Sequence, residues 1–283
     1  METYITTSDN VRLFCRVTGE GTPLLLIHGA MVDADFYLEI QQVLSKRMKV
    51  ITYDRRGYTR SGYSADGFPL NGAEYSFLLE RQAEDAAEVL RAFAYTDEDP
   101  VPAYVLGCSA GALTALKLIE KYPELVRHIY IHETPLVIFK ECMNPKEAQW
   151  LKDVYDTVLA GSVRQAIYKF IFGAAQAQHD PRAKALPMEV VDHQMQNGNI
   201  YLKEEFPEGY LMEEDFFDYR ALPADRITGL AGDSSPDGYC VKATKALMEK
   251  LGGRMFYIPG KHNAARELPN EFAAALYGFI ELT

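Results

Sequence analysis

Residues 104–113 read YVLGCSAGAL and place a single serine between two glycines, at a point where an apolar run changes character. Residues 103–106 are apolar and include a β-branched valine, which favours a buried strand, whereas residues 110–121 carry apolar side chains at helical spacing. A strand that turns at once into a helix strains the residue at the corner and requires small residues two positions to either side. Gly107 and Gly111 meet this requirement, so we expect the Ser109 hydroxyl to project above the sheet.

Strand and helix patterns alternate along most of the chain. Strand-like runs occur at residues 24–27, 50–53, 103–106, 129–132, 227–231 and 255–258, and helical patterns include residues 82–93, 241–251 and 269–280. Such alternation predicts an α/β fold with a mostly parallel, doubly wound sheet that is covered by helices on both faces. Two runs near the start, residues 3–6 and 11–17, are joined by Ser8-Asp9-Asn10 and predict an antiparallel hairpin at one edge.

The alternation is interrupted between about residues 136 and 219, where helical patterns such as 148–159 and 163–172 follow one another. We interpret this segment as a helical cap inserted after the sixth strand, with residues 1–135 and 221–283 as the core and residues 136–220 as the cap. Because ligands of open α/β sheets bind at the carboxyl ends of the strands, the cap should cover that end. The acidic stretch 203–219 is predicted to be a solvated face of the cap, which would disfavour anionic substrates if it lined the entrance.

Composition limits the partners and the location. The 283-residue chain carries a formal net charge of −11, which argues against nucleic acid or an anionic membrane as a partner and leaves a small-molecule substrate. Neither a signal-peptide pattern nor a bilayer-spanning apolar segment is visible, so we expect a cytoplasmic protein. The four cysteines lack C-x-x-C spacing, and we predict no metal and no organic cofactor. The sequence carries no signal of oligomeric state.

A serine hydroxyl becomes an effective nucleophile only when a base takes its proton, and the base is usually a histidine oriented by a carboxylate. Of the six histidines, His262 follows a late strand in the loop GKHNAAREL and should lie at the same end of the sheet as Ser109. His28 ends the apolar run LLLIHG and is interpreted as structural. The oxyanion would then be held by the N–H groups of Ala110 and Ala30, with Met31 as the alternative to Ala30. The alternative interpretation is that Ser109 is not catalytic and only caps the helix that follows it.

These segments together resemble the α/β-hydrolase fold superfamily, in particular capped serine hydrolases of the esterase and lipase type. LLLIHGA resembles the strand and oxyanion loop, YDRRGYTRSG the D-x-R-G-x-x-x-S segment, VLGCSAGA the nucleophile elbow, IYIHETP the strand before the cap, and PGKHN the histidine loop. The motifs occur in family order over nearly the whole chain. The resemblance implies a triad in the chain order serine, acid, histidine.

The acid of this triad is the point at which the sequence departs from the commonest family pattern. In many relatives the acid stands three residues beyond the glycine after the cap, but that position after Gly232 is Ser235. Glu133, which ends the preceding strand and resembles the acid of the dehalogenase branch, is preferred, and Asp233 is the alternative. Asp237 is an outside candidate. Asp54 precedes the serine, so we interpret Asp54 and Arg56 as residues that brace a loop.

The leading functional hypothesis is hydrolysis of a small or medium uncharged carboxylic ester through an acyl-enzyme on Ser109. Carbon–carbon bond hydrolysis, perhydrolysis or a lyase step on the same triad is the alternative, because fold alone does not determine the reaction. A non-catalytic ligand-binding protein of the same fold is the hypothesis from another class.

Overall fold

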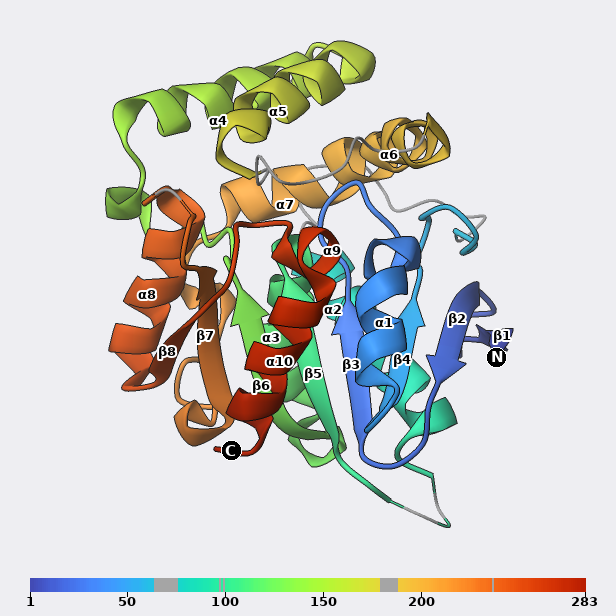
Figure 1. Ribbon diagram of the computed structural model, residues 1–283. Coiled ribbons are helices and arrows are strands. Elements are labelled where there is room, and N and C mark those ends of the chain that lie inside the picture. The colour runs from blue at the N-terminus through green and yellow to red at the C-terminus, as the bar shows by residue number, and fades with distance from the viewer. Residues whose placement is uncertain (64–75, 97, 99, 179–187, 236) are drawn as a thin grey trace.

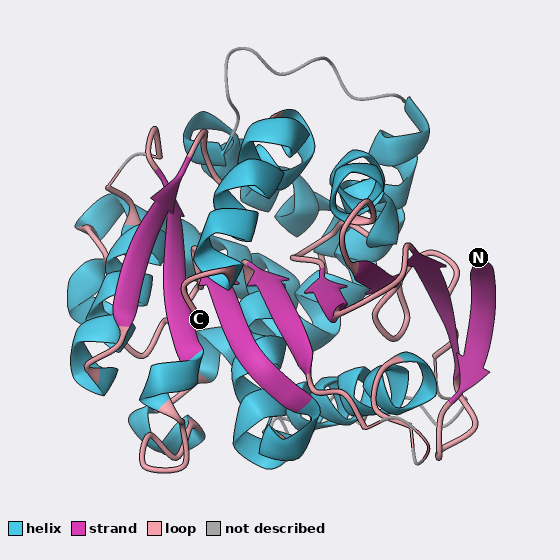
Figure 2. Cartoon of the chain, turned by 60° about the horizontal axis from the view of Figure 1, so that its bottom comes forward, coloured by secondary structure: helices cyan, strands magenta, loops and turns pink. Residues whose placement is uncertain are grey.

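The computed structural model describes residues 1–63, 76–96, 98, 100–178, 188–235 and 237–283. Within these residues the strands form one eight-stranded sheet in the order β1-β2-β4-β3-β5-β6-β7-β8, and Figure 2 shows it as a single twisted layer. The strands are β1 Glu2–Thr6, β2 Arg12–Thr18, β3 Pro23–Ile27, β4 Lys49–Tyr53, β5 Ala103–Cys108, β6 Val126–His132, β7 Ile227–Gly232 and β8 Arg254–Ile258.

The sheet is parallel from β4 to β8 and mixed at one edge. The hairpin β1–β2 is antiparallel, and β2 also pairs antiparallel with β4, whereas each remaining neighbouring pair is parallel. The predicted fold class and edge hairpin are therefore confirmed. Because all the parallel strands run in the same direction, their carboxyl ends meet at one edge of the sheet, which is the upper edge in Figure 1.

Helices cover both faces of this sheet (Figure 1). Leu25 and Ile27 of β3 share a buried cluster with α2, α3 and α8, whereas Leu24 and Leu26 share another with α1 and α10. Burial on both faces explains why β3 is a continuous apolar run in the sequence. Burial of each leucine side chain contributes about 1.5–3 kcal/mol to the free energy of folding. The helices of this part are α1 Leu38–Leu44, α2 Ser76–Phe93, α3 Ala110–Lys121, α8 Tyr239–Leu251, α9 Ala264–Glu267 and α10 Pro269–Ile280.

The segment between β6 and β7 contains helices α4 Pro145–Leu159, α5 Val163–Gln178, α6 Met188–Ile200 and α7 Phe206–Leu211, and a π-helical turn, Tyr201–Glu205, joins α6 to α7. These helices lie above the carboxyl ends of the strands (Figure 1). Their apolar side chains, including Leu151, Ile167 and Phe206, share a buried cluster with Met31 of the loop after β3 and with Ala110, the first residue of α3. The domain boundaries at residues 136 and 220 stay a prediction, and residues 179–187 of the predicted cap lie outside the described residues.

Candidate active site

Ser109 stands at the corner between β5 and α3 in a strained conformation, with φ 53° and ψ −124°. A left-handed φ is unfavourable for a residue with a Cβ atom, and such strain is concentrated at functional sites. The two flanking glycines make the corner possible. A Cβ atom on Gly107 would lie 2.5 Å from the Gly111 carbonyl oxygen, and one on Gly111 would lie 2.3 Å from the Ile27 carbonyl oxygen. The local sequence therefore explains the shape of this turn.

The Ser109 side chain makes no capping hydrogen bond to α3, which removes the structural explanation for a serine at this position. Ser109 instead lines two cavities that His262 also lines. Beside it runs the loop Gly29–Met31, in which a Cβ atom on Gly29 would lie 3.0 Å from Ser109 Cβ. The backbone N–H groups of Ala30, Met31 and Ala110 donate to no group within the described residues. Unpaired donors of this kind can stabilise an oxyanion.

His262 and Glu133 form a buried hydrogen-bonded pair. His262 Nδ1 lies 2.7 Å from Glu133 Oε2, and the side chains are 9% and 5% exposed. Glu133 follows β6 with a left-handed φ of 48°, and its Oε1 accepts hydrogen bonds from the Gly232 N–H and the Ser235 hydroxyl. Burial raises the pKa of Glu133, but the hydrogen bond from His262 and the neighbouring charges outweigh it and lower the pKa to about 2. The carboxylate is therefore ionised at neutral pH.

Asp233 and Asp237 lie elsewhere. Asp233 is exposed, and its Oδ1 accepts hydrogen bonds from the Gly260 N–H at 3.0 Å and the Ser234 hydroxyl at 2.9 Å. It therefore braces the loop before His262 and has no bond to the imidazole. Asp237 is 81% exposed and lies 3.8 Å from Lys242. Of the three sequence candidates, only Glu133 contacts His262.

Of the remaining described histidines, His28, His128 and His193 have partners away from Ser109, whereas the His132 ring stacks with that of His262 at a centroid distance of 5.9 Å. His28 Nε2 accepts the Arg55 N–H at 2.9 Å, and burial lowers its pKa well below the usual range. His128 lies 2.8 Å from the Thr228 hydroxyl. His132 is fully buried, and burial lowers its pKa to about 4. His193 pairs with Asp33, and His179 lies outside the described residues.

Buried ion pairs brace the loops beside the site, as expected for Asp54 and Arg56. Asp54 accepts the Ala34 N–H at 2.9 Å and pairs with Arg60 at 2.7 Å, and Arg56 pairs with Asp85 at 2.6 Å. These contacts connect the segment after β4 to the start of the 3-10 helix η1 (Ala34–Tyr37) and to α2. The DRRG motif thus has a structural explanation that requires no part in the reaction.

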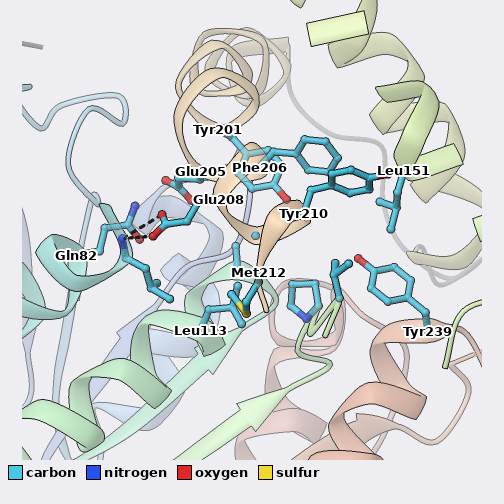
Figure 3. A pocket seen from close by; sticks show the side chains of 15 residues that line it. Gln82, Leu113, Leu151, Tyr201, Glu205, Phe206, Glu208, Tyr210, Met212 and Tyr239 are labelled. Atoms are coloured by element: carbon cyan, nitrogen blue, oxygen red, sulfur yellow. Dashed lines mark hydrogen bonds between the residues drawn. The ribbon is translucent and has the colours of Figure 1, made fainter. Parts of the chain in front are cut away.

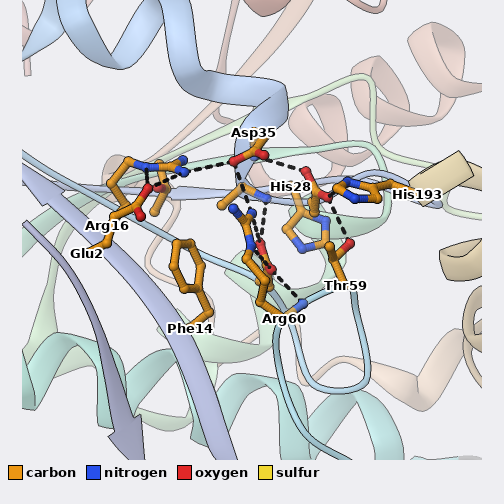
Figure 4. Close-up of polar contacts among 12 residues, drawn as sticks. Glu2, Phe14, Arg16, His28, Asp35, Thr59, Arg60 and His193 are labelled. Atoms are coloured by element: carbon orange, nitrogen blue, oxygen red, sulfur yellow. Dashed lines mark hydrogen bonds and ion pairs between the residues drawn. The ribbon is translucent and has the colours of Figure 1, made fainter. Parts of the chain in front are cut away.

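Helix α6 holds the loop that follows β3 (Figure 4). His193 Nδ1 lies 3.0 Å from Asp33 Oδ2, which also accepts the Thr59 hydroxyl at 2.8 Å. The fully buried Asn197, one helical turn later, accepts the Thr59 N–H at 2.9 Å. Asp33, Asp35 and His193 bring possible metal-ligand atoms within 4.8 Å of one another, but Asp35 faces Arg16 and Arg60 at 2.9 and 3.0 Å. We therefore interpret the group as a polar link between α6 and this loop.

Cavities extend from Ser109 in two directions. One is lined by residues 29–31 of the loop after β3 together with Phe36, Gln194, Asn263 and Arg266. The other is lined by aromatic side chains and Glu133, and it shares Pro135, Tyr201 and Tyr239 with a further apolar cavity next to Ala110. Figure 3 shows this further cavity, with Glu205, Glu208 and Gln82 at one side, Leu113 and Met212 below them, and Leu151 at the opposite side.

The prediction that the acidic stretch 203–219 is a solvated face is wrong for Glu205 and Glu208, which point into the cavity of Figure 3. Glu205 lies in the π-helical turn and pairs with Arg55 at 2.7 Å, with both side chains buried. Arg55 also donates to the Gly29 carbonyl at 2.9 Å, so this ion pair reaches the oxyanion loop. Glu208 accepts the Leu79 N–H in the first turn of α2.

Glu208→Gln is expected to stabilise the protein at alkaline pH. Burial, with the charges of Glu205 and Glu80, raises the pKa of Glu208 from 4.5 to about 8. Because this pKa is raised in the folded state, the stability from the neutral acid is complete below pH 4.5 and is lost as pH rises through about 8. Glutamine stays neutral and keeps the acceptor for Leu79. Urea unfolding should show the variant more stable by on the order of 3 kcal/mol at about pH 9 and nearly unchanged at about pH 5. A pH-independent difference would contradict this account.

A strained serine at a strand-to-helix corner, above a doubly wound sheet and beneath covering helices, is the arrangement of a hydrolytic α/β enzyme. Residues 22–178, more than half of the chain, match the family model of the alpha/beta hydrolase fold. The chain belongs to the alpha/beta hydrolase fold family and is a hydrolase.

Relatives and solved structures agree with this assignment. The chain is 27% identical over 273 residues to the uncharacterized hydrolase YraK of Bacillus subtilis, covering 94% of this chain and 91% of the relative. It is 24% identical over 280 residues to the mouse serine hydrolase BPHL, covering 96% and 84%. An alpha/beta hydrolase from Sphaerobacter thermophilus superposes with a TM-score of 0.72 at 18% identity, covering 98% and 100% of the two chains. An esterase from Exiguobacterium antarcticum gives 0.71 at 16% identity, covering 99% and 100%.

None of the helices in the described part of the chain combines the length and the apolarity needed to cross a bilayer.

Proposed function

We propose that this hydrolase cleaves a small or medium carboxylic ester through an acyl-enzyme on Ser109, with His262 as the general base and Glu133 as the acid that orients it. The observation that carries the proposal is a strained, uncapped serine that lines the same two cavities as a histidine whose Nδ1 lies 2.7 Å from a buried carboxylate. The near-full-length similarity to a protein named serine hydrolase supports it. The substrate is a small molecule that enters beneath helices α4 to α7.

The proposed chemistry follows from the tautomer that Glu133 selects. Because ionised Glu133 accepts from Nδ1–H, Nε2 of His262 carries a lone pair and can take the Ser109 proton. The serine oxygen attacks the ester carbonyl, and the tetrahedral oxyanion is held by the N–H groups of Ala110 and of Ala30 or Met31. Collapse of this intermediate breaks the bond to the alcohol, which takes the proton from His262. Water, deprotonated by His262, then releases the acid and restores Ser109.

A cytoplasmic location is part of the same proposal. All four cysteines lie in the described residues, and all are free thiols, as is usual in a reducing compartment. Burial raises the pKa of Cys108, the neighbour of Ser109, so this thiol stays neutral.

Labelling with a fluorophosphonate tests the nucleophile. We expect rapid modification of wild-type protein at Ser109, located by mass spectrometry of the peptide. Labelling of His262→Ala should be slower by at least about 10³-fold, because the serine then lacks its base. Equal labelling rates for the two proteins would contradict the assignment of His262. Hydrolysis of 4-nitrophenyl esters of graded chain length, compared with ketone and lactone substrates, then separates ester hydrolysis from the alternative reactions.

A further inference from the structure

Arg266 occupies an unusual position beside the catalytic groups. It lies on the single-turn helix α9, one turn after His262, and lines the cavity that contains Ser109 and the oxyanion loop. It also lines a second cavity, which shares Val32, Phe36 and Gln194 with the first. Arg266 therefore borders both the catalytic cavity and this second cavity.

Arg266 is partly exposed, and its guanidinium lacks the tight partner that several buried arginines of the chain have. Arg16, Arg55 and Arg56 each place a nitrogen within 2.6–2.7 Å of a carboxylate oxygen. By contrast, Arg266 Nη2 lies 3.8 Å from Glu267 Oε1, beyond hydrogen-bond distance. Its side chain is 17% exposed and donates no hydrogen bond within the described residues. The nearest ring is Phe36, with its centroid 5.3 Å from Arg266 Cζ.

A guanidinium in this environment has lost water without gaining a full set of acceptors. Burial lowers the pKa of Arg266, although the Glu267 charge opposes this effect. A buried charge without hydrogen-bonded partners is costly. An incoming anion relieves that cost, and the planar fork of N–H donors in arginine matches a carboxylate through paired hydrogen bonds.

The other groups that line this cavity do not compete for the cation. Gln194 and Asn263 offer neutral amides, and the remaining lining is largely apolar. Asp33 and Asp35, which line the second cavity, bind other groups. Asp33 contacts His193 and Thr59. Asp35 forms ion pairs with Arg16 and Arg60. Arg266 is therefore the permanently charged group of the catalytic cavity as the described residues define it.

We propose that Arg266 binds a carboxylate carried by the substrate, at the end of a chain that begins at the scissile ester. The inference rests on the proposed function, and it replaces the expectation of an uncharged substrate with a half-ester of a dicarboxylic acid or an ester of a hydroxy acid. In both classes an apolar linker lies beside Phe36 while the carboxylate meets the guanidinium. Arg266 is in this view a specificity-determining residue, whereas Ser109, His262 and Glu133 perform the reaction.

A matched pair of esters tests the proposal. Mono-4-nitrophenyl adipate carries a free carboxylate, and its methyl ester has the same acyl chain without the charge. Wild-type protein should favour the carboxylate substrate in kcat/KM. Arg266→Gln should lower the ratio of the two kcat/KM values by about 10- to 100-fold, the range for a charge-assisted hydrogen-bonded pair, mainly through KM. Arg266→Lys should restore part of the ratio. The exposed Arg254 provides the control, since Arg254→Gln makes the same charge change and should leave the ratio at the wild-type value.

A carboxylate in the alcohol part of the ester is tested with 4-acetoxybutyrate and its methyl ester. Hydrolysis of these two substrates is followed by titration of the released acid with base. If the carboxylate lies in the leaving group, this pair rather than the adipate pair should respond to Arg266→Gln. An unchanged ratio for both pairs overturns the proposal while leaving ester hydrolysis by Ser109 intact.

Binding provides a readout that is independent of turnover. Calorimetry with Ser109→Ala protein and monomethyl adipate should show binding that is weakened about 10-fold or more when Arg266→Gln is added. If no ester is hydrolysed but this loss of binding is found, the proposed function fails and the carboxylate site stands. Equal affinity in the two backgrounds overturns the site.

Discussion

Ser109→Ala is expected to lower kcat for ester hydrolysis by about 10⁶-fold without unfolding the protein. The size of the loss follows from the role of the hydroxyl as the attacking group, for which no neighbouring side chain substitutes. The fold should be unaffected because Ser109 makes no capping hydrogen bond and alanine keeps the same Cβ atom at the strained φ of 53°. Truncation at this position therefore separates chemistry from stability.

The measurement is kcat on 4-nitrophenyl butyrate together with thermal unfolding of the same samples. Ser162→Ala serves as the control for kcat, because Ser162 is exposed in the turn between α4 and α5, and it should show the wild-type kcat. Turnover near the wild-type rate in purified Ser109→Ala would remove Ser109 from the mechanism.

The fold was predictable because its information is local and repeated. A parallel strand that is buried on both faces must be continuously apolar, as residues 24–27 are, so the strand bounds could be predicted to within three residues. The corner at Ser109 was equally readable, since the close approach of Gly111 to the Ile27 carbonyl leaves no room for a side chain. Steric requirements of this kind appear directly as residue types in the sequence.

The buried acids were not predictable in the same way. Glu205 and Glu208 lie in a stretch that reads as a charged surface, yet the partner of Glu205 is Arg55, 150 residues earlier. A charge pattern gives the sign of each residue but not its tertiary partner. The available signal was the apolar surroundings of these acids, Tyr201, Leu202 and Phe206, all of which are buried. Arg266 was also missed, although it follows His262 by one helical turn, because the sequence does not show which arginine lacks a carboxylate.

The acid of the proposed triad was predictable only in part. Motif spacing narrowed the choice to Glu133 or Asp233, with Asp237 as an outside candidate, and the sequence alone could not decide how a two-residue shift along a loop moves a carboxylate. In the structure the loop after β7 turns so that Ser235, at the commonest family position, donates to Glu133, while Asp233 faces Gly260. Ser235, which stands where many relatives have the acid, thus supports Glu133, the proposed acid of this chain, through a hydrogen bond.

Glu133→Gln is therefore expected to lower kcat by about 10⁴-fold, whereas Asp233→Asn should change it far less. Ionised Glu133 holds Nδ1–H of His262 and stabilises the imidazolium that forms when the Ser109 proton is transferred. The amide of glutamine supplies no charge, and its NH₂ group would favour the tautomer in which Nε2 carries the proton and cannot act as a base. Asp233 braces a loop through the Gly260 N–H, a contact that the asparagine oxygen preserves.

Rates for Glu133→Gln, Asp233→Asn and wild-type protein should be compared near neutral pH, because the pKa of Glu133 is lowered to about 2 and the wild-type carboxylate is then fully ionised. KM should change little in either variant because neither side chain is proposed to bind the substrate, and fluorophosphonate labelling should slow in parallel with kcat. Unfolding curves show whether loss of the buried charge also destabilises the fold. A severe loss in Asp233→Asn with near-normal Glu133→Gln would transfer the acid role to Asp233, since a carboxylate that orients the imidazole cannot be replaced without affecting the rate.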